Sequence, residues 1–276
     1  MSENILQKII DKKKSRLVEL KIKRPLESFL EHPTDTIGHY NFKEAIEKRI
    51  SNGKISLVAE SKKASPSAGV IIKNYNPVEI AKIYQSKKAT CLSILTEEDF
   101  FLGNLSHIYK IKLNSNAMEN TGITLPILCK DFFIDTYQVA LAKSFGADCI
   151  LIILAALDKI LAKDIYQAAK DLNISTLVEV HTEKEAESAL YYEDSIIGIN
   201  NRNLKTLEVS LDTTIKLSHI LVSHSNPLVC ESGIHSYDDI KLIIDRAKIC
   251  NFLIGESLLT SSDIALKLKE FTQINQ

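Results

Sequence analysis

Charged side chains come directly after four short apolar runs of this 276-residue sequence. Glu60 and Lys62 are two residues apart, so both would point to the same face of a strand. Lys130, Glu179 and Glu231 each follow another apolar run. If the four runs end at one place, these lysines and glutamates form a buried cluster of mixed charge. Neighbouring charges and desolvation in such a cluster shift pKa values, as acid–base catalysis requires.

Two glycines and two aromatic residues indicate what such a site could bind. Gly233 and Gly255 follow further apolar runs, and together with a short helix N-terminus their loops could offer backbone N–H groups to a phosphate. Phe101 and Phe132 either pack against the fold or receive an aromatic ring of the substrate. The sequence therefore predicts a small phosphorylated substrate.

Other catalytic chemistries lack their sequence signatures. None of the seven histidines has metal-ligand spacing such as H-E-x-x-H, so we expect no metal site, and no G-x-S-x-G motif supports a serine hydrolase. His181 could border the cluster because it stands two residues after Glu179, but packing or solvent exposure is the expected role. The lysine run 12–14 is interpreted as a solvated helix face.

The charged residues end the strands of a repeating pattern that begins near residue 55. Eight short runs alternate with polar loops and segments of helical periodicity, and the centres of successive runs lie 20 to 36 residues apart. Runs that are apolar throughout are typical of strands buried on both faces. The expected strands are Ser56–Ala59, Thr90–Leu95, Pro126–Cys129, Cys149–Leu154, Thr176–Val180, Ile196–Asn200, Leu228–Cys230 and Phe252–Ile254.

Helices are expected before the first strand and after most of the others. Residues 1–31 have helical periodicity, with Ser2 as a candidate N-cap and interruptions at Pro25 and Pro33. The other expected helices are Pro77–Lys88, Thr136–Phe145, Lys159–Leu172, Glu183–Tyr191, Thr213–His219, Asp238–Arg246 and Ser262–Phe271.

Eight such alternations form either a doubly wound sheet or a closed barrel. The G-x-G-x-x-G motif of a doubly wound dinucleotide fold is missing, as is a P-loop. We therefore predict an α/β fold, a single (β/α)8 TIM barrel at residues 51–276, with an N-terminal helical extension packed on it at residues 1–50. Active sites of such barrels lie at the C-terminal ends of the strands, where the charged residues fall.

Composition and charge exclude several classes of partner. With 34 Lys and Arg against 35 Asp and Glu, the net charge of −1 provides no field for nucleic acid or an anionic membrane. The longest apolar run, residues 149–157, is about half a membrane span, and no secretory signal is visible. We expect a cytoplasmic protein whose five cysteines are small buried hydrophobic residues, not disulfides.

Together, these segments resemble the indole-3-glycerol-phosphate synthase family. The similarity covers nearly the whole chain, and residues 9–25 resemble the family's extra helix. Each motif alone is weak, whereas seven in the same order on one barrel are very specific. The matching segments are residues 59–67, 95–97 with 100–101, 128–132, 177–181, 198–204, 231–234 and 253–258.

The resemblance implies conversion of 1-(2-carboxyphenylamino)-1-deoxyribulose 5-phosphate into indole-3-glycerol phosphate, with loss of carbon dioxide and water and with no cofactor or metal. Lys130 resembles the general acid that protonates the ketone as the aromatic carbon attacks it. Glu179 resembles the general base of the later dehydration. Lys62 resembles a second acid or a partner of the carboxylate, and the division of labour between the two lysines stays open.

Supporting roles are implied for further residues. Glu60 would orient and polarise the lysines, and Asn200 and Ser232 would hold the reacting hydroxyl and carboxylate. Arg202 and Glu231 would be outer members of that network. Residues matching substrate or phosphate positions are Ser65, Ser232, Gly233, Gly255 and Glu256, and those matching the apolar pocket for the anthranilate ring are Phe101, Phe132, Leu151 and Leu204.

Two departures from the family pattern concern the phosphate. Ala64 stands where some relatives have a basic residue, which leaves less positive charge near the phosphate. Glu256 places a carboxylate beside that site, which is tolerable only if the side chain points away.

Three alternatives share parts of the pattern. A Schiff-base aldolase would use Lys130 as a nucleophile, although Glu60 and Glu179 would tend to keep lysines charged and so favour an acid role. Phosphoribosylanthranilate isomerase shares the fold and phosphate site, without the two strand-end lysines and the extension. A barrel without catalysis could serve as an assembly partner. We expect a monomer, with a weak homodimer as the alternative.

Overall fold

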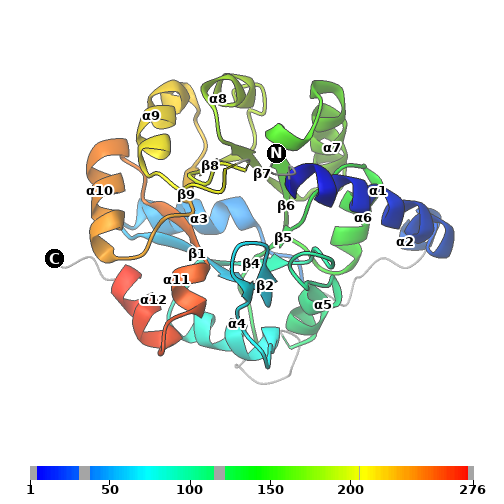
Figure 1. Cartoon of the computed structure of the whole chain (residues 1–276), viewed down its shortest axis with the longest axis horizontal. Coiled ribbons are helices and arrows are strands. Elements are labelled where there is room, and N and C mark those ends of the chain that lie inside the picture. The colour runs from blue at the N-terminus through cyan, green and yellow to red at the C-terminus, as the bar shows by residue number, and fades with distance from the viewer. Residues whose placement is uncertain (1–4, 31–37, 115–121, 205, 273–276) are drawn as a thin grey trace.

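The computed structural model describes residues 5–30, 38–114, 122–204 and 206–272, and its centre is a closed barrel of eight parallel strands (Figure 1). The strands follow chain order around the barrel, and β1 closes it by pairing with both β4 and β10. All eight predicted strands are confirmed, with ends shifted by at most two residues. They are β1 (Ser56–Ser61), β4 (Cys91–Leu95), β5 (Ile127–Lys130), β6 (Cys149–Ile153), β7 (Ser175–Val180), β8 (Ile196–Asn200), β9 (Leu228–Glu231) and β10 (Asn251–Ile254).

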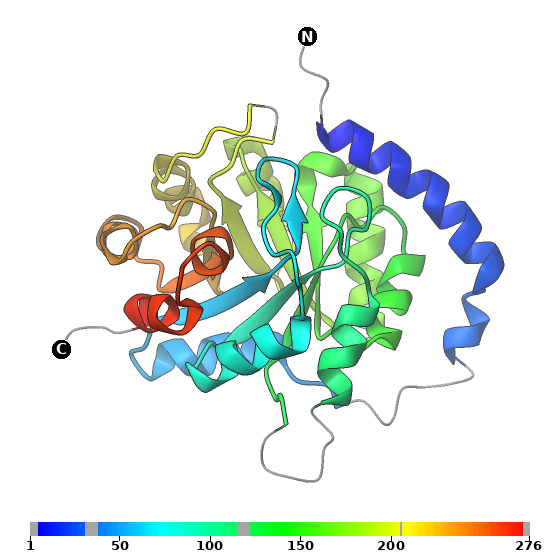
Figure 2. The same cartoon turned by 60° about the horizontal axis from the view of Figure 1, so that its bottom comes forward.

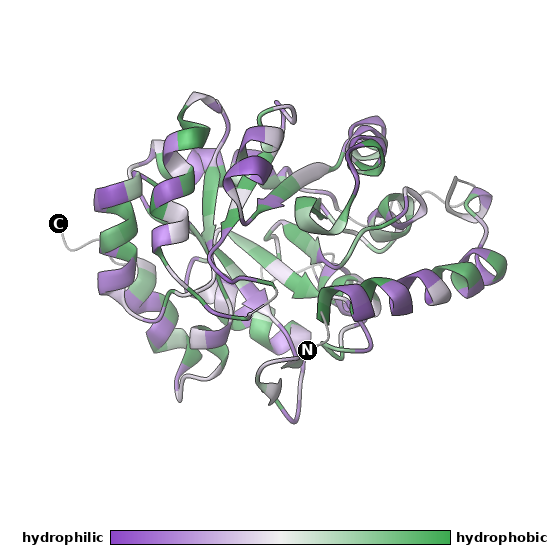
Figure 3. Cartoon of the chain, turned by 45° about the horizontal axis from the view of Figure 1, so that its top comes forward, coloured by the Kyte–Doolittle hydropathy of each residue, from purple (hydrophilic) through white to green (hydrophobic). Residues whose placement is uncertain are grey.

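Helices cover the outside of the barrel, and their apolar residues face the strands (Figure 3). The seven predicted helices between and after the strands are confirmed: α4 (Pro77–Ser86), α6 (Tyr137–Ser144), α7 (Lys159–Asp171), α8 (Glu183–Ala189), α9 (Asp212–Ile220), α10 (Tyr237–Ala247) and α12 (Ile264–Thr272).

An eighth outer helix, α5 (Ser106–Leu113), was not predicted. Its eight residues include two isoleucines and a tyrosine, which favour strands, and the preceding Leu105 provides no side-chain cap. The buried side chains Ile108, Ile111 and Lys112 nevertheless have helical spacing. Packing against the barrel therefore decides the conformation of this segment.

Helix α3 (Phe42–Ser51) closes the end of the barrel opposite the carboxyl ends of the strands. Asn41 caps it by accepting the backbone N–H of Glu44. Phe42 and Ile46 are buried among interior side chains of the barrel such as Leu128. This apolar floor leaves the carboxyl ends of the strands as the place for a polar site.

The N-terminal residues form α1 (Ile5–Lys23) and the short α2 (Glu27–Leu30), interrupted at Pro25 as predicted. Figure 2 shows α1 lying along the outside of the barrel beside the helices that follow β5 and β6. Leu17 packs there against Tyr137 and Leu141 of α6. The predicted cap Ser2 and the interruption at Pro33 lie outside the described residues. The division of the chain at residue 50 stays a prediction.

Small elements complete the carboxyl end of the barrel. A hairpin of β2 (Ala64–Ser65) and β3 (Gly69–Val70) follows β1 and was not predicted. The short helix α11 (Glu256–Leu259) follows β10, and the 3-10 turns η1 (Leu154–Ala156) and η2 (Leu221–Ser223) follow β6 and α9. All five cysteines are free, and four of them are buried as predicted, whereas Cys250 is only half-buried.

Candidate active site

A cavity opens at the carboxyl ends of the barrel strands, where the sequence predicted the site. Its empty space is about 1020 Å³, part of it open to solvent. The walls contain most of the predicted site residues: Glu60, Lys62, Phe101, Lys130, Phe132, Leu151, Glu179, Asn200, Arg202, Leu204, Glu231, Ser232, Gly233, Gly255 and Glu256. The closed barrel thus brings together residues that are up to about 200 positions apart in the chain.

Lys130 lies at the centre of the charged cluster. Its Nζ is 3.1 Å from Glu179 Oε2 and 3.2 Å from Glu231 Oε2, so one ammonium joins two carboxylates. The second lysine has its own partner, because Lys62 Nζ lies 2.6 Å from Glu60 Oε1. Glu231, which the resemblance placed in an outer position, therefore contacts the central lysine directly.

The electrostatics of the cluster follow from burial and from these contacts. Burial alone would lower the pKa of Lys130, but Glu179, Glu231 and Glu60 together raise it above its ordinary value. Burial acts to raise the pKa of both carboxyls of the pair. At Glu179 the combined effects of Lys130, His181 and Asn200 outweigh burial, so the pKa is lowered. At Glu231 burial prevails and the repulsion from Glu179 adds to it, so the pKa is raised. Glu179 is therefore held ionised.

Two glycines provide the room for these carboxylates. A Cβ at Gly198 of β8 would lie 2.0 Å from Glu231 Oε1, and a Cβ at Gly255 would lie 2.4 Å from Glu60 Oε1. Any larger residue would push the glutamate aside. Gly255 was predicted to bind phosphate and Gly198 was not singled out, since nothing in the sequence shows which side chain approaches either glycine.

The aromatic side of the cavity is formed by loops after β4 and β5. The rings of Phe101 and Phe132 have centroids 6.3 Å apart, and Leu151 and Leu204 also line the cavity. The buried Glu97 carboxylate accepts the backbone N–H groups of Asp99, Phe100 and Phe101 and so holds the Phe101 loop in place. This wall can accept a flat apolar ring.

The loops after β9 and β10 form the opposite, polar part. Ser232 and Gly233 both have positive φ, of 65° and 83°, so two successive residues adopt the left-handed conformation. Glu256, at the start of α11, turns its carboxylate to Arg202, with Oε2 3.6 Å from Nη2. The acidic side chain is thus partly neutralised by a neighbour, although it still lines the cavity.

Ser65 is placed elsewhere. It is a buried residue of the β2–β3 hairpin, and its Oγ accepts the backbone N–H of Ala68 at 3.2 Å. It is not among the described residues that line the cavity. The hydroxyl stabilises a turn, which the sequence could not reveal because the hairpin itself was not foreseen.

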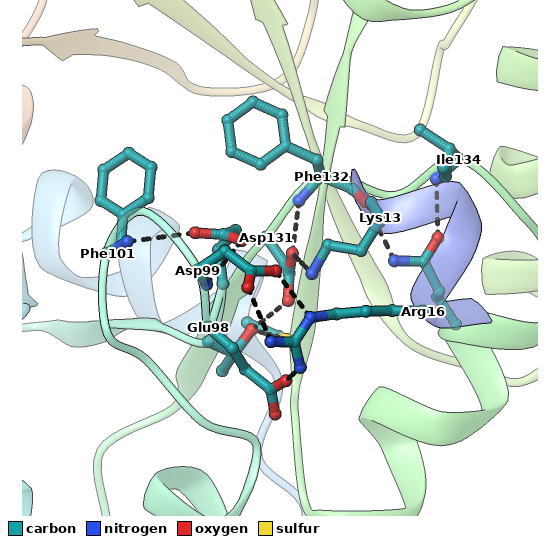
Figure 4. A network of polar contacts seen from close by, with 12 residues as sticks. Lys13, Arg16, Glu98, Asp99, Phe101, Asp131, Phe132 and Ile134 are labelled. Carbon is teal, nitrogen blue, oxygen red and sulfur yellow. Dashed lines mark hydrogen bonds and ion pairs between the residues drawn. The ribbon is translucent and has the colours of Figure 1, made fainter. Parts of the chain in front are cut away.

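A salt-bridge network joins α1 to this site, and here the interpretation of residues 12–14 as a solvated face was wrong for one lysine (Figure 4). Lys13 is buried, and its Nζ lies 2.6 Å from Oδ1 of Asp131, the residue after Lys130. Asp131 also accepts the Thr96 hydroxyl at 2.7 Å and the Phe132 backbone N–H at 2.8 Å. One buried carboxylate therefore connects α1, β4 and β5.

A second ion pair of α1 reaches the Phe101 loop. Arg16 donates to both Asp99 oxygens, at 2.6 and 2.7 Å, and also pairs with Glu98 (Figure 4). The sequence signal for this contact was weak, because a lysine-rich helix predicts exposure. The acidic Glu98 and Asp99, next to the predicted Phe101, were the only hint of a basic partner.

His181 also contacts the charged cluster, whereas packing or solvent exposure was the role expected from the sequence. Its side chain is only 8% exposed, and its Nε2 lies 3.2 Å from Glu179 Oε1. Further lining residues that were not proposed for the site are Leu95, Asp131, Ile153, Val209, Ile234, His235, Leu253, Ile254 and Ser257.

In the described parts of the chain, no group of three or more His, Cys, Asp or Glu could hold a metal ion. Every helix of those parts is too short or too polar to span a bilayer.

Comparison with known proteins identifies a family. Residues 6–271 match the family model described as indole-3-glycerol phosphate synthase. A protein with that name from Polaromonas naphthalenivorans (strain CJ2) is 39% identical over 267 residues, covering 97% of this chain and 98% of its own. Another from Alkaliphilus metalliredigens (strain QYMF) is 41% identical over 266 residues, covering 96% and 97%.

Solved structures share the fold at low sequence identity. A thiamine phosphate pyrophosphorylase from Pyrococcus furiosus has a TM-score of 0.56 at 15% identity, covering 79% of this chain and 93% of its own. Tryptophan synthase from M. tuberculosis in an open form has a TM-score of 0.59 at 9% identity, covering 85% and 98%. These structures share the barrel fold with this chain, and at such low sequence identity they carry no information about its reaction.

Proposed function

Since the chain belongs to the indole-3-glycerol phosphate synthase family, we propose that it closes the indole ring of 1-(2-carboxyphenylamino)-1-deoxyribulose 5-phosphate, with decarboxylation and dehydration, to give indole-3-glycerol phosphate in tryptophan biosynthesis. The observation that carries the proposal is the single ammonium of Lys130 between two buried carboxylates, in a cavity with an aromatic wall. Such a site combines a proton donor, a base and a place for the anthranilate ring.

Lys130 acts as the general acid. As the aromatic carbon attacks the ketone and the new C–C bond forms, the carbonyl oxygen becomes negative, and an ammonium on a rigid strand end can give it a proton. The three carboxylates that raise the pKa of Lys130 keep it charged before the reaction. Substrate that enters between Lys130 and one of these carboxylates makes the ammonium a stronger acid, because it loses part of its stabilisation.

Glu179 acts as the general base of the dehydration. Loss of the substrate carboxylate as carbon dioxide returns its electron pair to the ring, which restores aromaticity. The hydroxyl then leaves as water after it receives a proton from the ammonium of one of the two lysines, Lys62 or Lys130. Glu179 takes the proton that the carbon of the new five-membered ring must lose. Because Lys130, His181 and Asn200 lower its pKa, Glu179 is ionised at neutral pH, which is the form that a base requires.

The remaining residues position the substrate. Phe101, Phe132, Leu151 and Leu204 receive the ring, and the backbone of the loops around Gly233 and Gly255 receives the phosphate. Holding ring and ketone together lowers the barrier, because the ring is a weak nucleophile. Lys62, fixed by Glu60, serves as second acid or as partner of the substrate carboxylate. Asn200 and Ser232 hold the reacting hydroxyl and the carboxylate of the substrate.

A fluorescence assay tests this function. The chain contains no Trp, so the indole emission of the product would grow over a low background when the purified protein is mixed with the substrate. We expect product without added metal and in the presence of EDTA. A folded protein that forms no product would contradict the proposal and direct the search to other phosphorylated substrates.

Borohydride distinguishes the acid from a Schiff-base nucleophile. A charged Lys130, held by Glu179 and Glu231, cannot attack a carbonyl, so we expect no covalent adduct when substrate and borohydride are added together. A substrate adduct on Lys130 in the mass spectrum would instead support the aldolase alternative.

A further inference from the structure

His181 makes a contact to the proposed general base that the family mechanism above does not use. The residue comes directly after β7, and its two ring nitrogens face two carboxylates: Nε2 lies 3.2 Å from Glu179 Oε1, and Nδ1 lies 3.4 Å from Glu185 Oε2. A neutral imidazole carries a proton on one nitrogen only, so the doubly protonated ring alone can present N–H to both. The distance from Nε2 to Glu179 Oε1 is within ion-pair range, although the N–H is not aligned for a hydrogen bond there.

The position of this ring is set by the start of α8. Glu185 Oε2 accepts the backbone N–H of His181 at 2.7 Å, and the Thr182 hydroxyl accepts the N–H of Glu185 as the helix cap. The ring is therefore held from both its backbone and its side chain. Because it is only 8% exposed, water competes little for its contacts.

Each oxygen of Glu179 thus has its own cation. Oε2 faces the Lys130 ammonium and Oε1 faces His181. When Lys130 gives its proton to the substrate oxygen, it becomes neutral, and Glu179 loses one of its two cations. Glu231, which is buried and negative or protonated, cannot replace it. His181 is the cation that stays beside Glu179 at the moment when Glu179 must act as a base.

We propose that His181 is a positioning residue of the reaction, whose imidazolium keeps the Glu179 carboxylate ionised and oriented after Lys130 has donated its proton. This inference rests on the proposed function. It differs from the packing or exposure expected from the sequence, and it assigns His181 no direct contact with substrate. His181 is not among the described residues that line the active-site cavity; it lines a second cavity with Thr182 and Glu185.

The charges around His181 agree with an imidazolium. Burial alone would lower the pKa of His181, but Glu179 and Glu185 raise it to about 9. Cations face this neighbourhood as well, and one of them, Lys216 of α9, is paired with Glu183. The other charged residues lining the cavities beside His181 are Lys184 of α8, Asp212 of α9, and Arg202 and Glu208 of the loop after β8.

A titration by nitrogen NMR tests the charge without any substrate. The His181 ring signals, assigned by their loss in His181→Asn, should titrate more than one pH unit above the ordinary value of 6.5, and the midpoint should fall in Glu179→Gln. A midpoint at or below 6.5 in the unchanged protein would overturn the proposal. This measurement shows whether the His181 ring is doubly protonated, even if the proposed reaction is wrong.

Kinetics test the positioning role. Without the imidazolium, the pKa of Glu179 rises, so the acidic limb of the kcat profile in His181→Asn should move up by at least about one pH unit and kcat should fall roughly tenfold, with little change in KM. The matched control is His224→Asn, since His224 is a half-buried histidine whose Nε2 contacts a backbone carbonyl, that of Ser195, and not a carboxylate.

The two variants separate the possible results. An active enzyme in which His181→Asn has an unchanged pH profile, even with a lower melting temperature, would show a merely structural role and overturn the inference. If the unchanged protein makes no indole product at all, the proposed function fails, and the NMR titration remains the test of the imidazolium.

Discussion

At the residue scale, the site depends on two buried carboxylates that share one ammonium. Glu179 and Glu231 both contact Lys130, and burial makes it costly for both to be ionised at once. Their pKa values therefore move apart, down at Glu179 and up at Glu231. Divergent pKa values of neighbouring acids are typical of acid–base catalysis, and they point to Glu179 as the base.

Replacing the central ammonium should abolish the acid step. We expect Lys130→Met to lower kcat by roughly 10²- to 10⁴-fold, the usual contribution of a general acid. Because Met also leaves two carboxylates without their cation, Lys130→Arg is the control: it keeps the charge but does not release a proton. The indole fluorescence assay gives the rates, and calorimetry gives the stabilities. Normal kcat in either variant would contradict the assigned role.

Removing the negative charge of Glu179 should affect turnover more than binding. Glu179→Gln keeps the size of the side chain but cannot accept a proton, so we expect kcat to fall by about 10²-fold or more with a modest change in KM. Steady-state kinetics at several substrate concentrations measure both constants. A change confined to KM would argue that Glu179 only binds substrate.

At the scale of elements, α1 is tied to the site by a buried ion pair. Lys13 binds Asp131, which in turn holds Thr96 of the β4 loop and the backbone of Phe132. Arg16 adds a more exposed contact to the Phe101 loop, which is screened by solvent and weaker. Helix α1 therefore orients the aromatic wall and the strand end that carries Lys130.

Breaking the buried pair should disturb both docking and catalysis. We expect Lys13→Met to leave the Asp131 carboxylate buried without a cation, which costs about 3–5 kcal/mol for a pair of this kind. Because even a small displacement of a reacting group raises the activation barrier, kcat/KM should fall by roughly tenfold to a hundredfold. Limited proteolysis within α1 and steady-state kinetics measure the two effects.

The adjacent lysine provides the matched control. Lys14 is exposed on the same helix, so Lys14→Met should leave proteolysis and kcat/KM nearly unchanged. Equal effects of the two variants would mean that the charge of the helix, and not the Asp131 contact, matters.

At the scale of the whole molecule, the barrel buries its thiols. Cys91, Cys129, Cys149 and Cys230 are buried in strands, and burial raises the pKa of each. Only Cys250, the residue before β10, is half-buried. We expect the native protein to react with at most one equivalent of a thiol reagent and the denatured protein with five. Fast labelling of several thiols in the native state would show that the barrel opens readily.

The amino-acid sequence by itself determined the strands, most outer helices and the charged strand ends. Strands buried on both faces are apolar throughout, and a parallel barrel places every strand's carboxyl end on one face, so residues such as Lys130 and Glu179 could be assigned to one site from the pattern alone. The family motifs carried the same information.

Only the tertiary structure decided which of these residues touch. Lys13 is buried because Asp131 meets it across the fold, and His181 is charged because Glu179 and Glu185 both face its ring. Gly198 matters because the neighbouring strand brings Glu231 against it. The physical reason is common to all three: local periodicity reports whether a side chain faces the core, whereas a salt bridge or a close approach depends on a partner from a distant part of the chain.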